Sequence, residues 1–391
     1  MAFSYTRNTL AGSGDDFMTV VHLIFKGNQK EMGKFLAQIA KDELQVQKQP
    51  WTDPVNTKAQ REWMKEHWPQ HFQRMQGAAE AFGIALDDDR FEHSFLYYYW
   101  GLPGCSNVYY PPSCTTSGHG VLARNYDFST GTVFDLMNRP NAPSGYPNAT
   151  ARPFLVETYP DEGYATMVMS SYELLGGALD GINCQGLTVA LLASLDVLHS
   201  PHYAPLQKNG VGLHEIQLVR FLLETCKDAA EAREALRTLP QFYMTVPCHF
   251  IIADKAGNAF VWGHLPNKEV LHIPGKPGKP TAITNHYPVE HQDVIQSPIR
   301  EESISRLDRL HCGLAKAGGR SSQEDIQQAA QSVAATWPAG EGQYLSDKPA
   351  RTLWHAFYDQ MDNSLRIDFY LRDDNDGEIQ RSEWMAFRLE S

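Results

Sequence analysis

A cysteine directly after a glycine is the first feature of the sequence that could do chemistry. Cys105 follows Gly104, the last residue of the turn signal Gly101–Gly104, and opens a predicted strand. A thiol at a strand end, beside a glycine that tolerates strained backbone dihedrals, is well placed to be exposed and nucleophilic. A half-buried structural cysteine fits the same pattern and is the more common case, so this segment alone does not establish a reactive cysteine.

Charged residues on the next predicted strand could serve such a nucleophile. Arg124 and Asp127 stand among apolar residues in Arg124–Phe128, where an unpaired charge would be costly to bury. They could orient a nucleophile or bind a carboxylate, or form a surface ion pair. Because residues three apart on a strand point to opposite faces, one shared site would need a bend near Asn125 or Tyr126.

Two later segments offer further polar groups. Asn285, in Thr284–His286, could donate its amide hydrogens to an oxyanion, or it could form a simple Asx turn. Arg306 follows Ser305 early in a predicted helix, where a solvated helix face is the alternative.

Neither of two metal-like patterns holds. Asp374–Glu383 resembles a calcium loop, but Arg372 stands where the first acidic ligand is required, so the segment is predicted to be a hairpin turn. His67 and His71 have the spacing of a helical metal pair, but Pro69 disturbs the helix that would align them. The sequence predicts no metal site and no cofactor.

The composition is that of an ordinary globular protein. The 391 residues are 42% hydrophobic and 20% charged, with a net charge of −12 that argues against a nucleic acid as partner. No run of 18 apolar residues predicts a membrane span, and the N-terminus lacks a secretory pattern. We therefore expect a cytoplasmic location and six cysteines that are mainly free thiols.

Runs of helices and runs of strands follow one another along the chain. The first hundred residues are predicted to be helical, and strands begin after Gly104. Helices are predicted over Gln29–Gln47, Ala59–Phe82 with a break at Pro69, Leu213–Cys226, Ala229–Leu236 and Glu301–Leu314, and strands over Cys105–Tyr110, Gly120–Phe128, Thr166–Ser170, Leu187–Leu192, His249–Ile252, Ala259–Trp262, Thr352–Tyr358 and Leu365–Leu371. This order favours antiparallel sheets covered by helices, an α+β fold without separate domains.

Taken together, these segments resemble the penicillin acyltransferase-like branch of the N-terminal-nucleophile hydrolases, which includes acyl-CoA:6-aminopenicillanic acid acyltransferase and linear amide C–N hydrolases and is related to choloylglycine hydrolases. The family pattern is Gly-Cys, then G-R-N-x-D-[FW] about twenty residues later; here Ala123 replaces the glycine before Arg124. The other matches, in family order, are Leu23–Gly33, Gly181–Leu187, Arg220–Pro240, Thr284–His286 and Ser305-Arg306.

The resemblance implies a four-layer αββα sandwich that cuts its own Gly104–Cys105 bond. Residues 1–104 would form a helical N-terminal segment packed on the core, and residues 105–391 the catalytic core, within one structural domain. The freed α-amine of Cys105 would act as base for its own thiol, since an α-amine has a pKa near ~8.

The resemblance also assigns roles to the other residues. Asn285 would stabilise the oxyanion, Asp127 would hold the α-amine, and Arg124 and Arg306 would organise charge. Cys114 is an alternative nucleophile, because Cys114–Thr116 also matches a family start, but two strands and a loop fit poorly in the 13 residues between it and Asp127.

The implied substrate is a small-molecule amide or acyl-thioester, and the implied partner is the cleaved N-terminal fragment, with a homo-oligomer possible. Aromatic residues near Cys105, from Tyr97 to Trp100 and at Tyr109 and Tyr110, could line an acyl pocket or simply pack in the core. Two other functions are open: an unprocessed hydrolase in which His286 or another histidine activates Cys105 or Cys114, and a binding scaffold without catalysis.

Overall fold

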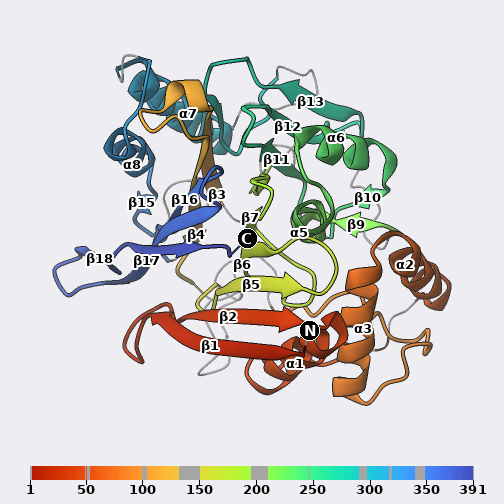
Figure 1. Ribbon diagram of the computed structural model, residues 1–391. Helices are drawn as coiled ribbons and strands as arrows, with labels where there is room; N and C mark the ends of the chain where they lie inside the picture. The colour runs from red at the N-terminus through yellow and green to blue at the C-terminus, as the bar shows by residue number, and fades with distance from the viewer. Residues whose placement is uncertain are drawn as a thin grey trace.

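Two large β-sheets lie face to face, and helices cover the outer side of each (Figure 1). The computed structural model describes residues 2–48, 50, 53–98, 104–131, 150–194, 210–244, 246–289, 297–316, 319–339 and 348–390. Turn signals at residues 101–103 and the aromatic residues 99 and 100 lie outside these ranges.

The first sheet has nine strands in the order β1-β2-β5-β6-β7-β8-β11-β12-β13. Their bounds are β1 Ser4–Ala11, β2 Val20–Gly27, β5 Phe154–Pro160, β6 Thr166–Ser170, β7 Asp180–Asn183, β8 Thr188–Ala193, β11 Cys248–Ala253, β12 Ala259–His264 and β13 Val270–Pro274. All neighbours are antiparallel except β2 and β5, which run parallel.

The second sheet has eight strands around the path β14-β3-β4-β16-β17-β18, with β15 on β16 and β19 on β17. Their bounds are β3 Gly104–Tyr110, β4 Val121–Ser129, β14 Thr281–Ile283, β15 Thr336–Trp337, β16 Ala350–Asp359, β17 Ser364–Asp373, β18 Ile379–Arg381 and β19 Met385–Arg388. A small parallel pair, β9 Leu213–His214 and β10 Gln241–Phe242, stands apart from both sheets.

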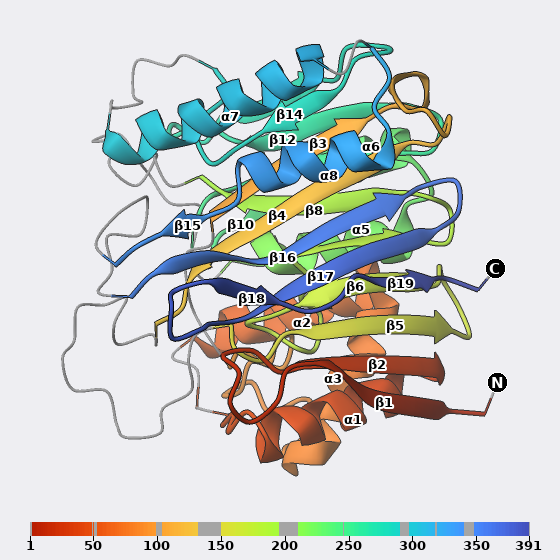
Figure 2. The ribbon, with the colours of Figure 1, turned by 90° about the vertical axis from the view of Figure 1, so that its left-hand side faces the viewer.

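The helices form the two outer layers. α5 Glu215–Thr225 packs on β6, β7 and β8, and α6 Ala229–Thr238 on β11. On the other side α7 Pro298–Lys316 packs on β14 and α8 Gln323–Ser332 on β4, and both lie in front of the eight-stranded sheet in Figure 2. α1 Gln29–Asp42, α2 Pro54–His67 and α3 Pro69–Phe82 gather beside β1 and β2 (Figure 1).

This arrangement confirms the predicted four-layer αββα fold and most of its elements. The predicted helix break at Pro69 separates α2 from α3, and the strands on either side of the 111–120 connection are the hairpin β3–β4. In the tight turn between β17 and β18, the Asp374 carboxylate accepts a hydrogen bond from the backbone N–H of Asp376. Strands rather than helices flank this turn, so the hairpin prediction for the calcium-like segment is confirmed.

The N-terminal segment differs from its prediction, because it is not only helical. β1 and β2 form a hairpin that extends the nine-stranded sheet, with β2 alongside β5. β2 is almost entirely buried, whereas β1 is exposed along most of its length. β1 therefore lacks the buried apolar face that a sequence pattern can reveal, and β2 finds its partner about 130 residues away.

Candidate active site

Cys105 is the second residue of β3, near the N-terminal end of this strand. Its side chain is 0% exposed and belongs to the apolar core between the two sheets. It lies opposite Tyr126 of β4 in the antiparallel register, and Gly104 lies opposite Asp127. The hairpin thus brings the beginning of β3 beside the charged segment of β4.

The two faces of this hairpin surround Cys105 from opposite sides. Arg124 points between the sheets, where its Nε donates to Asp180 of β7 at 3.0 Å. Asp127 points to the helix layer, where a carboxylate oxygen lies 3.7 Å from Arg306 of α7. No bend brings Arg124 and Asp127 to one face. The thiol of Cys105 lies on the same side of the hairpin as Arg124, and Arg306, which lies near Asp127 on the other side, contacts the backbone of Cys105.

Asn285 contacts the nitrogen of Cys105 directly. The backbone N–H of Cys105 donates to Asn285 Oδ1 at 2.8 Å, and the Nδ2 of Asn285 donates to the Ala193 carbonyl at 2.8 Å. Asn285 follows β14, which pairs with β3, so the sheet itself places it there. In the uncut chain this backbone N–H thus donates to Asn285, and the role assigned to Asp127, that of holding the free α-amine, stays a prediction.

Arg306 ties these groups together. Its Nη1 donates to the Cys105 carbonyl at 2.7 Å and to Ser106 Oγ at 3.0 Å, and its Nη2 donates to Asn285 Oδ1 at 2.9 Å. Its Nε donates to Glu302 one helical turn earlier, at 2.9 Å. The side chain is completely buried, so this predicted helix residue does not lie on a solvated face.

Burial controls the protonation of the site. Burial raises the pKa of the Cys105 thiol to about 12, and Arg124 is the strongest influence in the opposite direction. Burial likewise raises the pKa of Asp127 to about 6, against the lowering effect of Arg306 and of the Thr352 hydroxyl, which donates to Asp127 at 2.5 Å. In the intact chain the thiol is therefore protonated near neutral pH, and it needs a base to react.

Cys114 lies at the other end of the hairpin, in the short 3₁₀ helix Pro112–Cys114. Its Sγ donates to the Gly278 carbonyl at 3.1 Å, and a cavity of about 590 Å³ lies nearby, lined in part by Ser113 and Gly278. The four polar residues gathered at Cys105 are all at the opposite end of β3 and β4, so the structure does not bring Cys114 to them.

The contacts of His286 and of the two tyrosines on β3 do not favour a histidine-activated thiol or an aromatic acyl pocket. His286 Nδ1 lies 2.9 Å from Ser303 Oγ, so this ring nitrogen is already engaged, and burial lowers the pKa of His286 to about 4. Tyr109 and Tyr110 are buried further along β3, and the Tyr109 hydroxyl donates to the Asp254 carbonyl, which is the contact of a packing residue.

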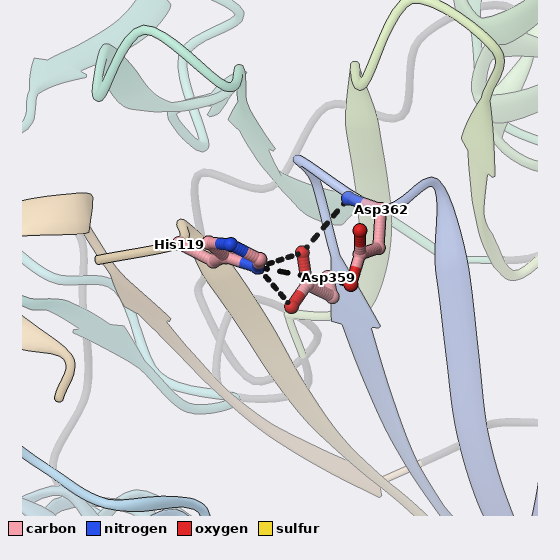
Figure 3. A group of neighbouring side chains, drawn as sticks. All are labelled: His119, Asp359 and Asp362. Atoms are coloured by element: carbon pink, nitrogen blue, oxygen red, sulfur yellow. Dashed lines mark hydrogen bonds and ion pairs between the residues drawn. The ribbon is translucent and has the colours of Figure 1, made fainter. Parts of the chain in front are cut away.

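A different cluster is the group in which a metal ion could be held. His119, Asp359 and Asp362 offer ligand atoms within 4.8 Å of one another at the ends of the β3–β4 and β16–β17 connections (Figure 3). The Asp359 carboxylate, however, is already hydrogen-bonded to His119 Nδ1 at 2.8 Å, and it accepts hydrogen bonds from the backbone N–H groups of Met361 and Asp362. These contacts account for the cluster as a hydrogen-bonded turn. Of the two histidines with helical metal-pair spacing, His71 is buried against the Ser94 carbonyl and His67 is exposed.

Asp180, Tyr358 and Thr352 are polar site neighbours that the sequence interpretation missed. Asp180 immediately precedes the matched segment Gly181–Leu187, but nothing in its spacing links it to Arg124, which is 56 residues earlier. Thr352 and Tyr358 lie on β16, whose pairing with β4 becomes visible only in the folded sheet.

Comparison with known proteins adds a family match. Residues 114–374 match the model of the family described as acyl-coenzyme A:6-aminopenicillanic acid acyl-transferase, which is more than half of the chain. The range includes the polar residues at positions 124, 127, 285 and 306. It begins at Cys114, so that Cys105 lies just before it.

Solved structures of low identity are also similar. Penicillin V acylase from Agrobacterium tumefaciens is 14% identical with a TM-score of 0.45, over 68% of this chain and 82% of that chain. A mutant of conjugated bile acid hydrolase from Clostridium perfringens is 13% identical with a TM-score of 0.45, over 73% of this chain and 97% of that chain. No curated protein matches the chain. Within the described residues, no helix is long and apolar enough to cross a membrane.

Proposed function

Because the chain belongs to the acyl-coenzyme A:6-aminopenicillanic acid acyl-transferase family, we propose that it is an N-terminal-nucleophile enzyme with Cys105 as nucleophile. It cleaves or transfers an acyl group at a linear amide or thioester through an acyl-Cys105 intermediate. The observation that carries the proposal is the convergence of Asn285 and Arg306 on the backbone of Cys105.

The enzyme first cuts its own chain. The Cys105 thiol attacks the Gly104 carbonyl, the peptide bond gives way to a thioester, and water releases residues 1–104 with a free carboxylate. Cys105 then becomes the first residue of the second fragment, with a free α-amine. Arg306 supports this step, since it holds the Cys105 carbonyl at 2.7 Å and so fixes the peptide unit that follows the nucleophile.

The α-amine then acts as the general base. Its pKa near ~8 lets it take the thiol proton at neutral pH, so no histidine is required. Asn285 Oδ1 already accepts a hydrogen from this nitrogen in the uncut chain, so it can orient the amine after cleavage. On the opposite face Arg124 favours the thiolate.

The substrate carbonyl is attacked by the thiolate, and its oxygen becomes an oxyanion. The Nδ2 of Asn285 carries two hydrogens, of which Ala193 accepts one; among the described residues no group accepts the other, which can be donated to the oxyanion. Collapse of this intermediate, in which the protonated α-amine returns its proton to the leaving group, expels the amine or thiol and leaves acyl-Cys105. Water or an acceptor amine releases the acyl group.

Intact mass spectrometry under denaturing conditions tests the proposal. Wild-type protein should give fragments 1–104 and 105–391, whereas Cys105→Ala should stay intact and Cys114→Ala should be cut like wild type. A fragment that begins at Cys114, where the family match also begins, would keep the enzyme class and replace the nucleophile. An uncut wild-type chain that is active would instead support a histidine-assisted thiol, and an uncut, inactive chain a binding scaffold.

A second experiment detects the acyl-enzyme and identifies the acyl group that it carries. Wild-type protein is incubated with a panel of small N-acyl amides and acyl-thioesters, and the mass of fragment 105–391 should rise by that of the acyl group. Addition of an amine acceptor separates transfer from hydrolysis, because transfer consumes the acceptor and hydrolysis does not.

A further inference from the structure

The guanidinium of Arg124 is held by the sheet opposite to its own. Arg124 stands on β4 of the eight-stranded sheet, but its Nε donates to Asp180 Oδ2 at 3.0 Å and its Nη1 to the Leu191 carbonyl at 2.6 Å. Asp180 and Leu191 lie on β7 and β8 of the nine-stranded sheet. Arg124 and Asp180 are both 0% exposed, so this ion pair crosses the dry interior of the sandwich.

Asp180 is itself fixed by a second contact. The hydroxyl of Tyr358 donates to its Oδ1, while Oδ2 accepts from Arg124. Tyr358 lies on β16, which pairs with β4, so Asp180 is hydrogen-bonded by side chains from two neighbouring strands of the opposite sheet. A carboxylate whose two oxygens are both engaged has one orientation, and a planar guanidinium paired with it has one as well.

The third nitrogen of the Arg124 guanidinium lies outside these contacts, on a side chain whose charge favours the Cys105 thiolate. This nitrogen, Nη2, has no hydrogen-bond partner within the part of the chain that the structure describes, although it is buried. In the hairpin, Arg124 is diagonal to Cys105, which lies opposite Tyr126 on the same face. Two of the three guanidinium nitrogens are thus fixed by the opposite sheet, and the third remains for the sulfur.

We propose that Asp180 is a positioning residue that holds the Arg124 guanidinium against the Cys105 thiolate. The inference rests on the proposed function, in which this thiolate is the nucleophile. It deepens that proposal by naming the group that aims the cation. Tyr358 completes the arrangement by fixing Asp180 in turn.

The two possible roles of Asp180, to balance the charge of Arg124 or to position it, predict opposite changes in the pKa of the Cys105 thiol when Asp180 is replaced. The carboxylate is itself a negative charge near Cys105, and by itself it disfavours the thiolate. If it only neutralised Arg124, its removal would lower the pKa of the thiol. If it positions Arg124, its removal lets the guanidinium turn away, and the pKa of the thiol rises.

The test measures how fast iodoacetamide alkylates Cys105 from pH 6 to 10. The reaction is quenched by denaturation, and the modified peptide is quantified by mass spectrometry so that the other cysteines do not interfere. In Asp180→Asn, which keeps the shape and removes the charge, we expect alkylation at pH 8 to slow about tenfold, equivalent to about one unit of pKa. Tyr358→Phe should shift the profile in the same direction by less.

Asp368→Asn is the matched control, because Asp368 is also a buried partner of an arginine, Arg381 at 2.6 Å, but lies on β17, which does not pair with β3 or β4. Its alkylation profile should equal that of wild type. An unchanged or faster Asp180→Asn profile, in protein whose thermal melting shows a folded state, would overturn the positioning role. The proposed function fails separately, when the wild-type chain is neither cut nor acylated, and the alkylation profile still reports on Asp180 in that case.

Discussion

At the scale of single residues, the two groups of Cys105 that are proposed to react, the thiol and the nitrogen, face different surroundings. The thiol lies in the apolar interior near Arg124, whereas the backbone nitrogen lies toward Asn285. Cleavage before Cys105 would turn that nitrogen into an amine without moving its partner. The base and the nucleophile would then belong to one residue but be controlled separately.

Asn285 should matter for the rate more than for substrate binding. In Asn285→Ala, the α-amine loses its acceptor and the oxyanion loses a donor, so we expect kcat to fall about 100-fold or more with a small change in KM. Steady-state kinetics on fully cleaved enzyme measure this. Intact mass must be checked first, because slow self-cleavage would mimic the loss; Ser305→Ala, next to Arg306 but without a described contact to Cys105, serves as the control.

Asp127 should make stability depend on pH. Burial raises its pKa to about 6, so the folded chain keeps this proton between about pH 4 and 6, where the unfolded chain has lost it. The stability that it contributes is complete below about pH 4 and is lost as the pH rises through about 6. Between pH 4.5 and 7, the free energy of unfolding should therefore fall for the parent relative to Asp127→Asn.

Urea denaturation of both proteins at several pH values checks this, with Cys105→Ala as the parent so that the chain stays in one piece. Equal slopes of stability against pH for the two proteins, or a slope in the other direction, would contradict the raised pKa.

At the scale of elements, α1 and α3 approach so closely that only glycine fits at their crossing. A Cβ added to Gly77 would lie 1.9 Å from the Lys30 carbonyl oxygen, and one added to Gly33 would lie 2.1 Å from that of Arg74. Both obstacles are backbone atoms of the facing helix, so rotation of a side chain cannot relieve them. The helix pair must move apart to accept any other residue.

Gly77→Ala should therefore destabilise the protein by about 2 kcal/mol or more, even though alanine favours helices. Thermal or urea unfolding measures the loss. Gly14→Ala is the control, because an added Cβ there meets nothing within 4 Å, and its stability should match that of wild type. A Gly77→Ala protein as stable as wild type would mean that the two helices can separate at little cost.

The elements that the sequence predicts well are those with a local signal. Helical periodicity and Pro69 locate α1 to α3, and the turn-bounded strands around Cys105 emerge as β3 and β4 with shifts of one residue. β1 has no such signal because most of it is exposed. The strand pattern also leaves open which strands become neighbours.

The site follows the same division. The polar residues that carry a motif, such as Arg124 and Asn285, can be singled out along the chain. Asp180 cannot, because its link to Arg124 depends on how two sheets stack. Likewise, the contact between Asn285 and the nitrogen of Cys105, which are 180 residues apart, depends on the pairing of β14 with β3.

At the scale of the whole molecule, the proposed cut separates chain segments that share one core. Residues before Cys105 supply β1 and β2 to the nine-stranded sheet and contribute to the same apolar cluster as the rest of the chain. The two fragments are also joined by a buried charge cluster, in which Arg74 of α3 donates twice to Glu224 of α5, at 2.7 and 2.8 Å. Self-cleavage should therefore leave the fragments bound to each other.

Glu224 should be the polar residue on which that association depends most. It also accepts from Arg220 and from the Trp68 indole, so Glu224→Ala would leave two buried guanidinium groups without their carboxylate, at a cost of about 3–5 kcal/mol. On size-exclusion chromatography in increasing urea, wild-type fragments should elute together well beyond the concentration that separates those of the variant. Glu390→Gln removes the exposed contact between Lys26 and Glu390, which also joins the two fragments, and should change little. Release of residues 1–104 from wild type without denaturant would instead make this segment a removable propeptide, despite its two strands in the sheet.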